Sequence, residues 1–313
     1  MPNDEYQGMK PRILVLGASG RTGWAVVDAL EKQPETVEVV LASRRHDRVD
    51  AWKREGRHAV YLDLDDARTF PEALAGIDRL SLMTGYTVGM VHQSKTIVDA
   101  AAESGVSFIV HLGVFGNGKS TDPHFAWHEM IERYIEGSSV AWCHVHPHFF
   151  MENLLTSYPL LNGRLVWFMG EKRVGWIAND DLAGVVAKVL AEGPARHAGQ
   201  NYWLSTEAMN GVEIAKALTQ GLGRDIACDV KTPDDLMTLL ASHALELPAA
   251  STTETTCAAS TLEWMRQTYD GRMDYAAVAT TTVQDLLGRP PLGLRAWAEL
   301  HRDAVWAASI ATV

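Results

Sequence analysis

Three glycines near the N-terminus have the spacing of a turn that binds a dinucleotide phosphate. An apolar run at residues 12–16 leads into Gly17, Gly20 and Gly23, and apolar residues then recur at helical spacing. In that order, strand, turn and helix aim unpaired backbone N–H groups and the positive helix end at a pyrophosphate. The alternative is a glycine-rich turn without a ligand. The residues expected to contact a cofactor here are Gly17, Ser19, Gly20, Arg21, Thr22 and Gly23.

Two arginines follow the second apolar run, residues 37–42, at the point where a dinucleotide fold meets the adenosine ribose. Arg44 lies 21 residues after Gly23, next to Ser43 and Arg45. An acidic residue there would hold the ribose hydroxyls of NAD, whereas a guanidinium suits the 2′-phosphate of NADP(H). We therefore expect Ser43, Arg44 and Arg45 to bind NADP(H). Two solvated loop charges are the alternative interpretation.

Histidines concentrate in one part of the chain. Six of the twelve lie between residues 111 and 148, namely His111, His124, His128, His144, His146 and His148. A histidine titrates near neutral pH and can donate the proton that a hydride acceptor needs, so His124 and His128 are the candidate catalytic residues. His111 and His144 fit better as hydrogen-bonded core groups. Because no metal-ligand spacing such as HExxH occurs, no metal site is expected.

The helix that carries this pair is predicted from apolar spacing. Trp127, Met130, Ile131, Tyr134 and Ile135 recur at helical intervals, which predicts an amphipathic helix over residues 127–136 with that stripe facing the core. If the helix extends back to residue 124, His124 and His128 share one face, because residues four apart are neighbours on a helix.

Short apolar runs that alternate with helical segments predict a doubly wound parallel α/β sheet. Residues 59–62, 79–83, 107–112 and 140–146 read as strands, and residues 91–104 as a helix. Ligands of such sheets bind at the carboxyl ends of the strands. Further cofactor contacts are therefore expected at Asp63, Leu64, Met83, Thr84, Gly85 and Gly113.

An aromatic stretch follows the sixth predicted strand. Residues 147–153 read PHFFMEN, and aromatic and thioether side chains suit a flat, apolar substrate. Core packing at a domain junction is the alternative interpretation. The candidate substrate-binding residues are Phe115, His148, Phe149, Phe150 and Asn153.

Composition excludes several classes of function. The chain has 313 residues, a net charge of −11 and three cysteines without metal or disulfide spacing. The acidic balance argues against nucleic acid or an anionic membrane as a partner, and no apolar run is long enough to span a bilayer. We expect a cytoplasmic protein that binds a small-molecule substrate, as a monomer or homodimer.

Residues 9–155 are expected to form the nucleotide-binding domain, with segments near 174–204 returning to its sheet. Residues 156–313 are expected to form a smaller substrate-binding subdomain, in which some of the tryptophans line the pocket.

Taken together, residues 17–23, Arg44, residues 124–153 and residues 286–291 resemble the NmrA-like branch of atypical short-chain dehydrogenases/reductases. This resemblance implies a Rossmann fold, a nicotinamide cofactor (usually NADPH) and a C-terminal subdomain that closes over the substrate. Members of the family include quinone, azo-dye and triphenylmethane-dye reductases, and also redox sensors that bind the cofactor without evident turnover.

The chain departs from the pattern of the wider superfamily at its catalytic positions. The Tyr-x-x-x-Lys pair is absent from the expected segment, and His124 and His128 stand at that spacing. Family members often carry a lysine where this chain has His128, which implies that His128 also contacts the cofactor. A serine frequent after the fifth strand is Gly113 here. The sequence thus predicts an NADPH-dependent reductase of a small apolar or aromatic acceptor, with a non-catalytic NADP(H) sensor as the alternative.

Overall fold

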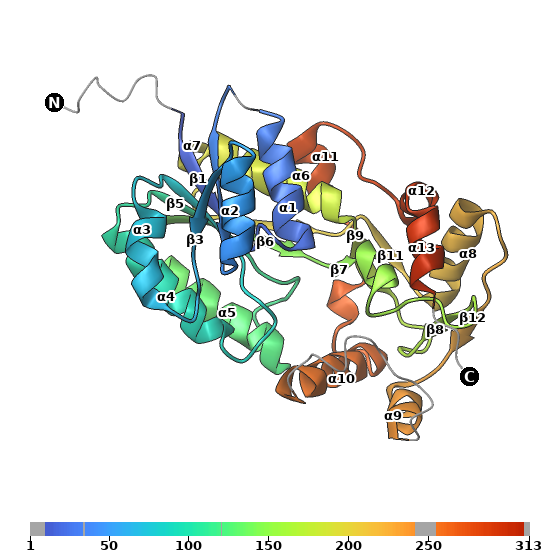
Figure 1. Ribbon diagram of the computed structural model, residues 1–313. Helices are drawn as coiled ribbons and strands as arrows, with labels where there is room; N and C mark the ends of the chain where they lie inside the picture. Colours follow the sequence, from blue (N-terminus) through green and yellow to red (C-terminus); the bar gives the residue numbers. More distant parts are fainter. Residues whose placement is uncertain (1–9, 34, 120, 242–254, 310–313) are drawn as a thin grey trace.

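The computed structural model describes residues 10–33, 35–119, 121–241 and 255–309. Its centre is a seven-stranded, wholly parallel sheet in the order β10-β6-β5-β4-β1-β2-β3 (Figure 1). The predicted Rossmann-type sheet is confirmed. Its strands are β1 (Arg12–Val15), β2 (Glu38–Ser43), β3 (His58–Tyr61), β4 (Arg79–Leu82), β5 (Phe108–Leu112), β6 (Ala141–Pro147) and β10 (Gln200–Leu204).

Helices cover both faces of this sheet because alternate side chains of each strand point to opposite sides. In β1, Ile13 and Val15 pack into one core cluster, whereas Leu14 packs into another. On the first face lie α1 (Arg21–Glu31), α2 (His46–Arg54), α6 (Asn179–Glu192), α7 (Pro194–His197) and α11 (Thr282–Leu287). On the second lie the short η2 (Ala67–Thr69), α3 (Phe70–Leu74), α4 (Met90–Glu103) and α5 (Pro123–Glu136).

Helix α5 has the predicted period, and Ile131 and Ile135 of the predicted stripe are buried, but the buried face is rotated toward Phe125 and His128. Met130 and Tyr134 were expected inward and are instead 61% and 38% exposed. The buried positions are Phe125, His128, Ile131 and Ile135. The prediction is wrong at Met130 and Tyr134 because α5 turns polar side chains, His128 among them, toward the sheet. Tyr134 instead reaches α4, where its hydroxyl donates to Asp99.

The second half of the chain contains two smaller sheets. One consists of β7 (Phe149–Phe150), β9 (Val174–Ile177) and β11 (Glu207–Met209), and the other of β8 (Leu165–Trp167) and β12 (Cys228–Val230). The expectation that segments near 174–204 return to the central sheet is correct for β10 and wrong for β9, which pairs with β7 and β11. The chain turns away here because β7 follows directly after β6 and offers β9 a new parallel edge.

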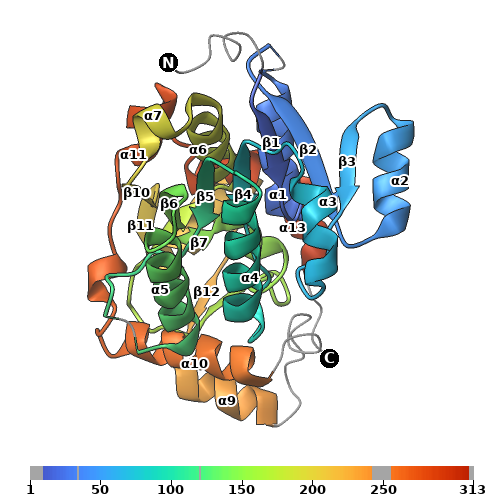
Figure 2. The same cartoon turned by 90° about the vertical axis from the view of Figure 1, so that its left-hand side faces the viewer.

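Helices pack around these small sheets and form a separate core cluster with Trp167, Trp176 and Trp297 fully buried. Figure 2 shows α9 and α10 together at one end of the molecule, beneath α4 and α5. The elements of this region are η3 (Met151–Leu155), α8 (Gly211–Leu222), α9 (Pro233–Ala241), α10 (Thr255–Tyr269), η4 (Asp274–Ala276), α12 (Leu294–Leu300) and α13 (Arg302–Ala308). Within the described ranges, no helix combines the length and apolar character needed to cross a bilayer.

The contact between α1 and the glycine turn that precedes it gives a direct test of the fold. A Cβ on Gly23 would lie 2.2 Å from the Gly17 carbonyl oxygen, far inside van der Waals contact. We expect Gly23→Ala to push α1 off the turn and to lower the free energy of unfolding by about 1–3 kcal/mol, as overpacking does. Urea denaturation followed by circular dichroism measures this. Gly89→Ala, whose Cβ would meet nothing closer than 3.6 Å, is the control, and equal midpoints for the two variants would contradict the prediction.

Candidate active site

The glycine turn leaves the beginning of α1 open to an anion. Gly17 has a φ of +66°, which an L side chain rarely adopts, and the Gly20 N–H donates to the Gly17 carbonyl oxygen at 2.8 Å. Gly20 is the N-cap of α1, and no side chain caps the first turn. The amide groups of Arg21 and Thr22 therefore start a helix whose positive end has no acceptor among the described residues, which fits the phosphates of a dinucleotide.

Arg44 and Arg45 both lie exposed just after β2, but they differ in their partners. Arg45 pairs with Asp47 at 2.6 Å, whereas Arg44 forms no hydrogen bond or ion pair with any described residue. Beside them the rings of His46 and Tyr61 stack with centroids 3.9 Å apart. This flat surface next to a free guanidinium fits an adenine and a 2′-phosphate. Sequence reasoning missed the stack, although both residues lie next to strand ends.

The other predicted cofactor residues lie at the carboxyl ends of neighbouring strands. Asp63 and Leu64 follow β3, and both are partly buried. Met83, Thr84 and Gly85 follow β4, and the Met83 Sδ lies 3.6 Å from where a Gly17 Cβ would be. The topology therefore gathers these residues beside the glycine turn, at the edge where parallel sheets bind ligands.

Gly113 follows β5 and has a packing reason to be glycine. A Cβ there would lie 2.7 Å from Glu132 Oε1 and 3.1 Å from His146 Nδ1. A serine, as the resemblance implied for this position, would displace one of these side chains. The absent serine thus makes room for a partly buried glutamate and a buried histidine.

All five predicted substrate residues, Phe115, His148, Phe149, Phe150 and Asn153, line one pocket of about 310 Å³. We call it the aromatic pocket. It lies beyond the carboxyl ends of β4, β5 and β6. The structure adds residues that sequence reasoning did not select, namely Tyr86, Val114, Asp122, Phe125, Pro147, Ser157, Tyr158, Thr261 and Trp264, together with the predicted His124.

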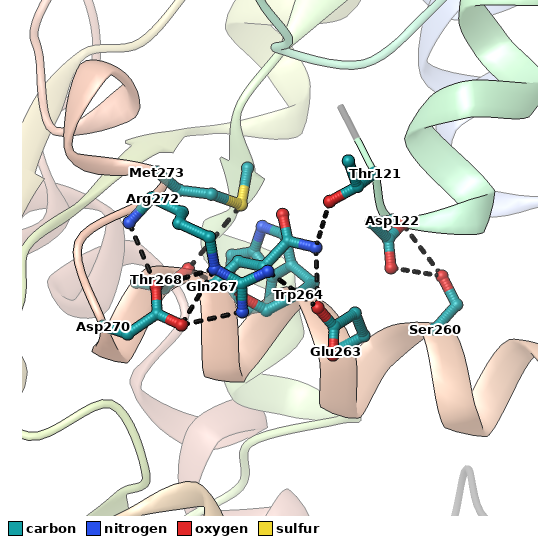
Figure 3. Close-up of polar contacts among 10 residues, drawn as sticks. All are labelled: Thr121, Asp122, Ser260, Glu263, Trp264, Gln267, Thr268, Asp270, Arg272 and Met273. Carbon is teal, nitrogen blue, oxygen red and sulfur yellow. Dashed lines mark hydrogen bonds and ion pairs between the residues drawn. The ribbon is translucent and has the colours of Figure 1, made fainter. Parts of the chain in front are cut away.

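Helix α10 forms one wall of the aromatic pocket. Trp264 stacks on Phe149 with centroids 5.3 Å apart and planes 5° apart. Figure 3 shows how α10 is held: Ser260 Oγ donates to the Asp122 carboxylate at 2.7 Å, and Gln267 Nε2 donates to Thr121 Oγ1 at 3.0 Å. The sequence predicts that some tryptophans of residues 156–313 line the pocket, and Trp264 is one of them.

His124 and His128 do share one face of α5, because the helix begins at Pro123. Their ring centroids are 4.8 Å apart, and His124 also lies 3.8 Å from the Tyr86 ring. Burial lowers the pKa of His124 to about 4 and that of His128 well below its ordinary value. Both imidazoles are therefore neutral at pH 7. Of the two, only His124 lines the aromatic pocket.

Three further histidines of the cluster, His111, His144 and His146, lie beneath α5. His111 and His144 share a hydrogen bond between their Nδ1 atoms at 3.2 Å, and His146 lies between the Val114 carbonyl at 3.1 Å and Asn201 at 2.9 Å. This agrees with the prediction of core histidines for His111 and His144. Among the described residues, no group of three or more His, Cys, Asp or Glu side chains is arranged to hold a metal ion.

Burial of these imidazoles links stability to pH. The pKa of His144 is lowered to about 3, chiefly by burial, so between its ordinary 6.5 and about 3 the unfolded chain binds a proton that the folded chain does not. Stability must then fall as the pH drops from 6.5. The free energy of unfolding of the wild type should therefore decrease between pH 6.5 and 5. We expect this decrease to be about 2 kcal/mol smaller in His144→Gln, because one such histidine contributes roughly 1.4 kcal/mol per pH unit. Urea titrations at both pH values measure it, and an identical loss in wild type and variant would refute it.

Comparison with known proteins agrees with this architecture. Over 301 residues the chain is 27% identical to an NAD(P)H azoreductase of Xenophilus azovorans. The aligned region covers 95% of this chain and 100% of that protein. It is 25% identical over 237 residues to quinone oxidoreductase 2 of Escherichia coli K12, covering 74% of this chain and 82% of that one.

Solved structures share the fold at lower identity. Triphenylmethane reductase from Citrobacter sp. superposes with a TM-score of 0.77 at 19% identity, covering 94% of this chain and all of that one. NmrA, a negative transcriptional regulator solved in complex with NADP, superposes with a TM-score of 0.72 at 15% identity, covering 94% and 97%. The model of the NmrA-like family matches residues 9–272, which is most of the chain. This protein therefore belongs to the NmrA-like family.

Proposed function

We propose that this protein is an NADPH-dependent reductase of the atypical short-chain type, which reduces a small apolar or aromatic acceptor such as a quinone, enone, imine or dye. The observation that carries the proposal is the aromatic pocket at the same sheet edge as the uncapped glycine turn. Family membership and the reductases among its relatives support it. A cytoplasmic location and a monomeric or homodimeric state remain predictions.

Residues at the sheet edge would hold the cofactor. The N-terminus of α1 offers its amides to the pyrophosphate, and the free Arg44 guanidinium offers charged hydrogen bonds to the 2′-phosphate. The His46–Tyr61 stack gives the adenine a flat neighbour. Met83, Thr84, Gly85 and Gly113 lie toward the nicotinamide end. When bound, NADPH supplies a hydride.

The aromatic pocket would position the acceptor and exclude water. Phe149 and Trp264 present stacked rings, and Phe115 and Tyr158 add apolar surface, which suits a flat π-system. No lysine or arginine is among the residues that line it. Burial raises the pKa of the Tyr158 phenol, so this hydroxyl stays protonated. Rate acceleration would then come mainly from orientation in a dry site.

His124 is the proposed proton donor, because its neutral ring lines the aromatic pocket. A positioned general acid contributes about 10²- to 10⁴-fold in rate. The His128 ring adjoins the His124 ring and is not among the residues that line the aromatic pocket.

A non-catalytic NADP(H) sensor is the second candidate. The observation that favours it is the missing Tyr-x-x-x-Lys pair, which leaves the pocket without a permanently charged group to activate a donor. The regulator NmrA, solved with NADP, has the same fold. Tight NADPH binding without turnover of any acceptor would favour this function.

The cofactor assignment can be tested at Arg44. A hydrogen bond to a charged group is worth roughly 1.5–3 kcal/mol, so Arg44→Ala should reduce the preference for NADPH over NADH by about 10- to 150-fold. Titration of protein fluorescence with each nucleotide measures the two dissociation constants. Arg48→Ala, an exposed arginine on α2, is the matched control. An unchanged preference in Arg44→Ala would disprove the 2′-phosphate contact.

The reductase activity can be tested with a panel of quinones, enones, imines and azo compounds, by following NADPH absorbance. We expect turnover of at least one class. His124→Phe keeps a ring beside Tyr86 but has no N–H proton to donate to the acceptor. It should lower kcat about 10²-fold or more with NADPH affinity unchanged. His92→Phe on the exposed side of α4 is the control. Wild-type kcat in His124→Phe would exclude His124 as the donor.

A further inference from the structure

Four imidazoles form a row that leads from the aromatic pocket beneath α5. The ring centroids of His124 and His128 are 4.8 Å apart, and those of His128 and His111 are 5.7 Å apart. His111 and His144 are 3.2 Å apart between Nδ1 atoms, and His144 Nε2 lies 3.9 Å from Glu136 Oε1. We call these four residues the histidine row. It therefore begins at the aromatic pocket and ends at a glutamate.

A second pocket, of about 300 Å³, lies at the other end of this row. Its lining includes Glu129, Glu132 and Glu136 of α5, and we call it the acidic pocket. His128 lines it as well, so one member of the row faces it directly. Val114 and Phe125 line both pockets and form the wall between them. His124 and His128 thus link the two sides of this wall.

A neutral histidine needs such a link in order to act as an acid. At pH 7 His124 carries one ring proton, and losing that proton alone would leave a strongly basic imidazolate. The loss becomes feasible when a second proton arrives at the other ring nitrogen at the same time. His128 is the adjacent ring, and its Nδ1 is buried without a hydrogen-bond partner among the described residues. The geometry therefore supplies the neighbour that a neutral donor requires.

We propose that the histidine row is a proton path that carries protons from the acidic pocket to the acceptor in the aromatic pocket. The proposal rests on the reductase function. As the acceptor gains a hydride, His124 gives its ring proton to the acceptor heteroatom and takes one from His128. His128 is reprotonated from the acidic pocket, directly or through His111 and His144. Each imidazole gains and loses one proton, so its net charge does not change.

The acidic pocket contains a group that holds a proton at neutral pH. Burial, together with the neighbouring charges of Glu136 and Glu129, raises the pKa of Glu132 to about 8 against the opposing charge of Arg133. Its Oε1 lies 3.4 Å from His146 Nδ1, in the space that Gly113 leaves. Glu132 is thus a protonated acid in the same pocket as His128.

At the aromatic end, Asp122 and Tyr86 already have structural partners, whereas His148 accepts from the Phe149 N–H with Nδ1 and has a buried Nε2 without a partner among the described residues. Asp122 caps α5 by accepting from the Phe125 N–H, and it also accepts from Ser260. The Tyr86 ring packs against His124. Of the two histidines that line the aromatic pocket, His124 is the one that adjoins His128, so the contacts favour the route through His128.

The test compares wild type with His128→Gln, which forms hydrogen bonds but cannot relay a proton. With NADPH and an acceptor that the wild type reduces, we expect kcat to fall about 10²-fold or more. The solvent deuterium isotope effect on kcat should rise. Imidazole in the buffer should restore part of the activity of His128→Ala, because the acidic pocket opens onto this position. His197→Gln, another buried histidine that lines neither pocket, should keep kcat within about twofold.

Glu132→Gln tests the source of the proton. In the wild type the rate should fall as the pH rises through about 8, because the carboxyl group then loses its proton. Glu132→Gln should be slower at pH 7 and should lack this decline. A wild-type kcat and isotope effect in His128→Gln, or a decline above pH 8 that is unchanged in Glu132→Gln, would overturn the proposal.

A measurement without turnover separates this proposal from the proposed function. The exchange of the His124 ring proton with water, measured by nuclear magnetic resonance, should be slower in His128→Gln than in wild type. If the wild type oxidises no NADPH with any acceptor, the reductase function fails, and this exchange rate still decides whether the path exists. Equal exchange rates would refute the path and leave the reductase function intact.

Discussion

The buried carboxylate of Asp122 is the interaction on which the site depends. It accepts from the Phe125 N–H at 3.1 Å, which begins α5, and from Ser260 Oγ at 2.7 Å, which holds α10 (Figure 3). Helix α5 carries His124 and His128, and α10 carries Trp264. One carboxylate therefore determines where the proposed donor lies relative to the aromatic wall. Burial raises its pKa although these hydrogen bonds oppose the shift, so the contacts with the helix amide and the hydroxyl offset only part of the cost of burying it.

A second buried carboxylate joins the two halves of the molecule. Glu152 accepts from Trp297 Nε1 at 2.9 Å and from the Asn179 N–H at 3.1 Å. Its carbonyl oxygen accepts from Arg21, in the first turn of α1, at 3.4 Å. The loop that lines the aromatic pocket is thereby tied to the glycine turn, to α6 and to α12. A cofactor at the turn and an acceptor in the pocket would be positioned by the same set of contacts.

The histidines beneath α5 combine a cost in stability with a chemical use. Burial lowers the pKa of His124, His128, His111 and His144, so each of them destabilises the fold in acid. Apolar residues of similar size would avoid this cost. A flat apolar pocket without lysine lacks a proton donor that is reprotonated after each transfer. A row of neutral imidazoles does provide one. The absence of the Tyr-x-x-x-Lys pair and the presence of the row are consistent with one another.

Local sequence determined much of the fold. The glycine turn, the strands of the central sheet and the helix bearing His124 and His128 follow from apolar periodicity and backbone demands within a few residues of each position. Pattern also identified five residues that share one pocket, namely Phe115 after β5 and four residues of the stretch 147–153.

Tertiary structure alone decided which face of α5 is buried, the departure of β9 from the central sheet, and the meeting of Trp264, Tyr158 and Asp122 at the pocket. It also placed Glu132 opposite His146, an arrangement possible only because Gly113 lacks a side chain. These features depend on residues far apart in the chain. The helical period determines which side chains share a face of α5, but only packing against the sheet determines which of these faces is buried.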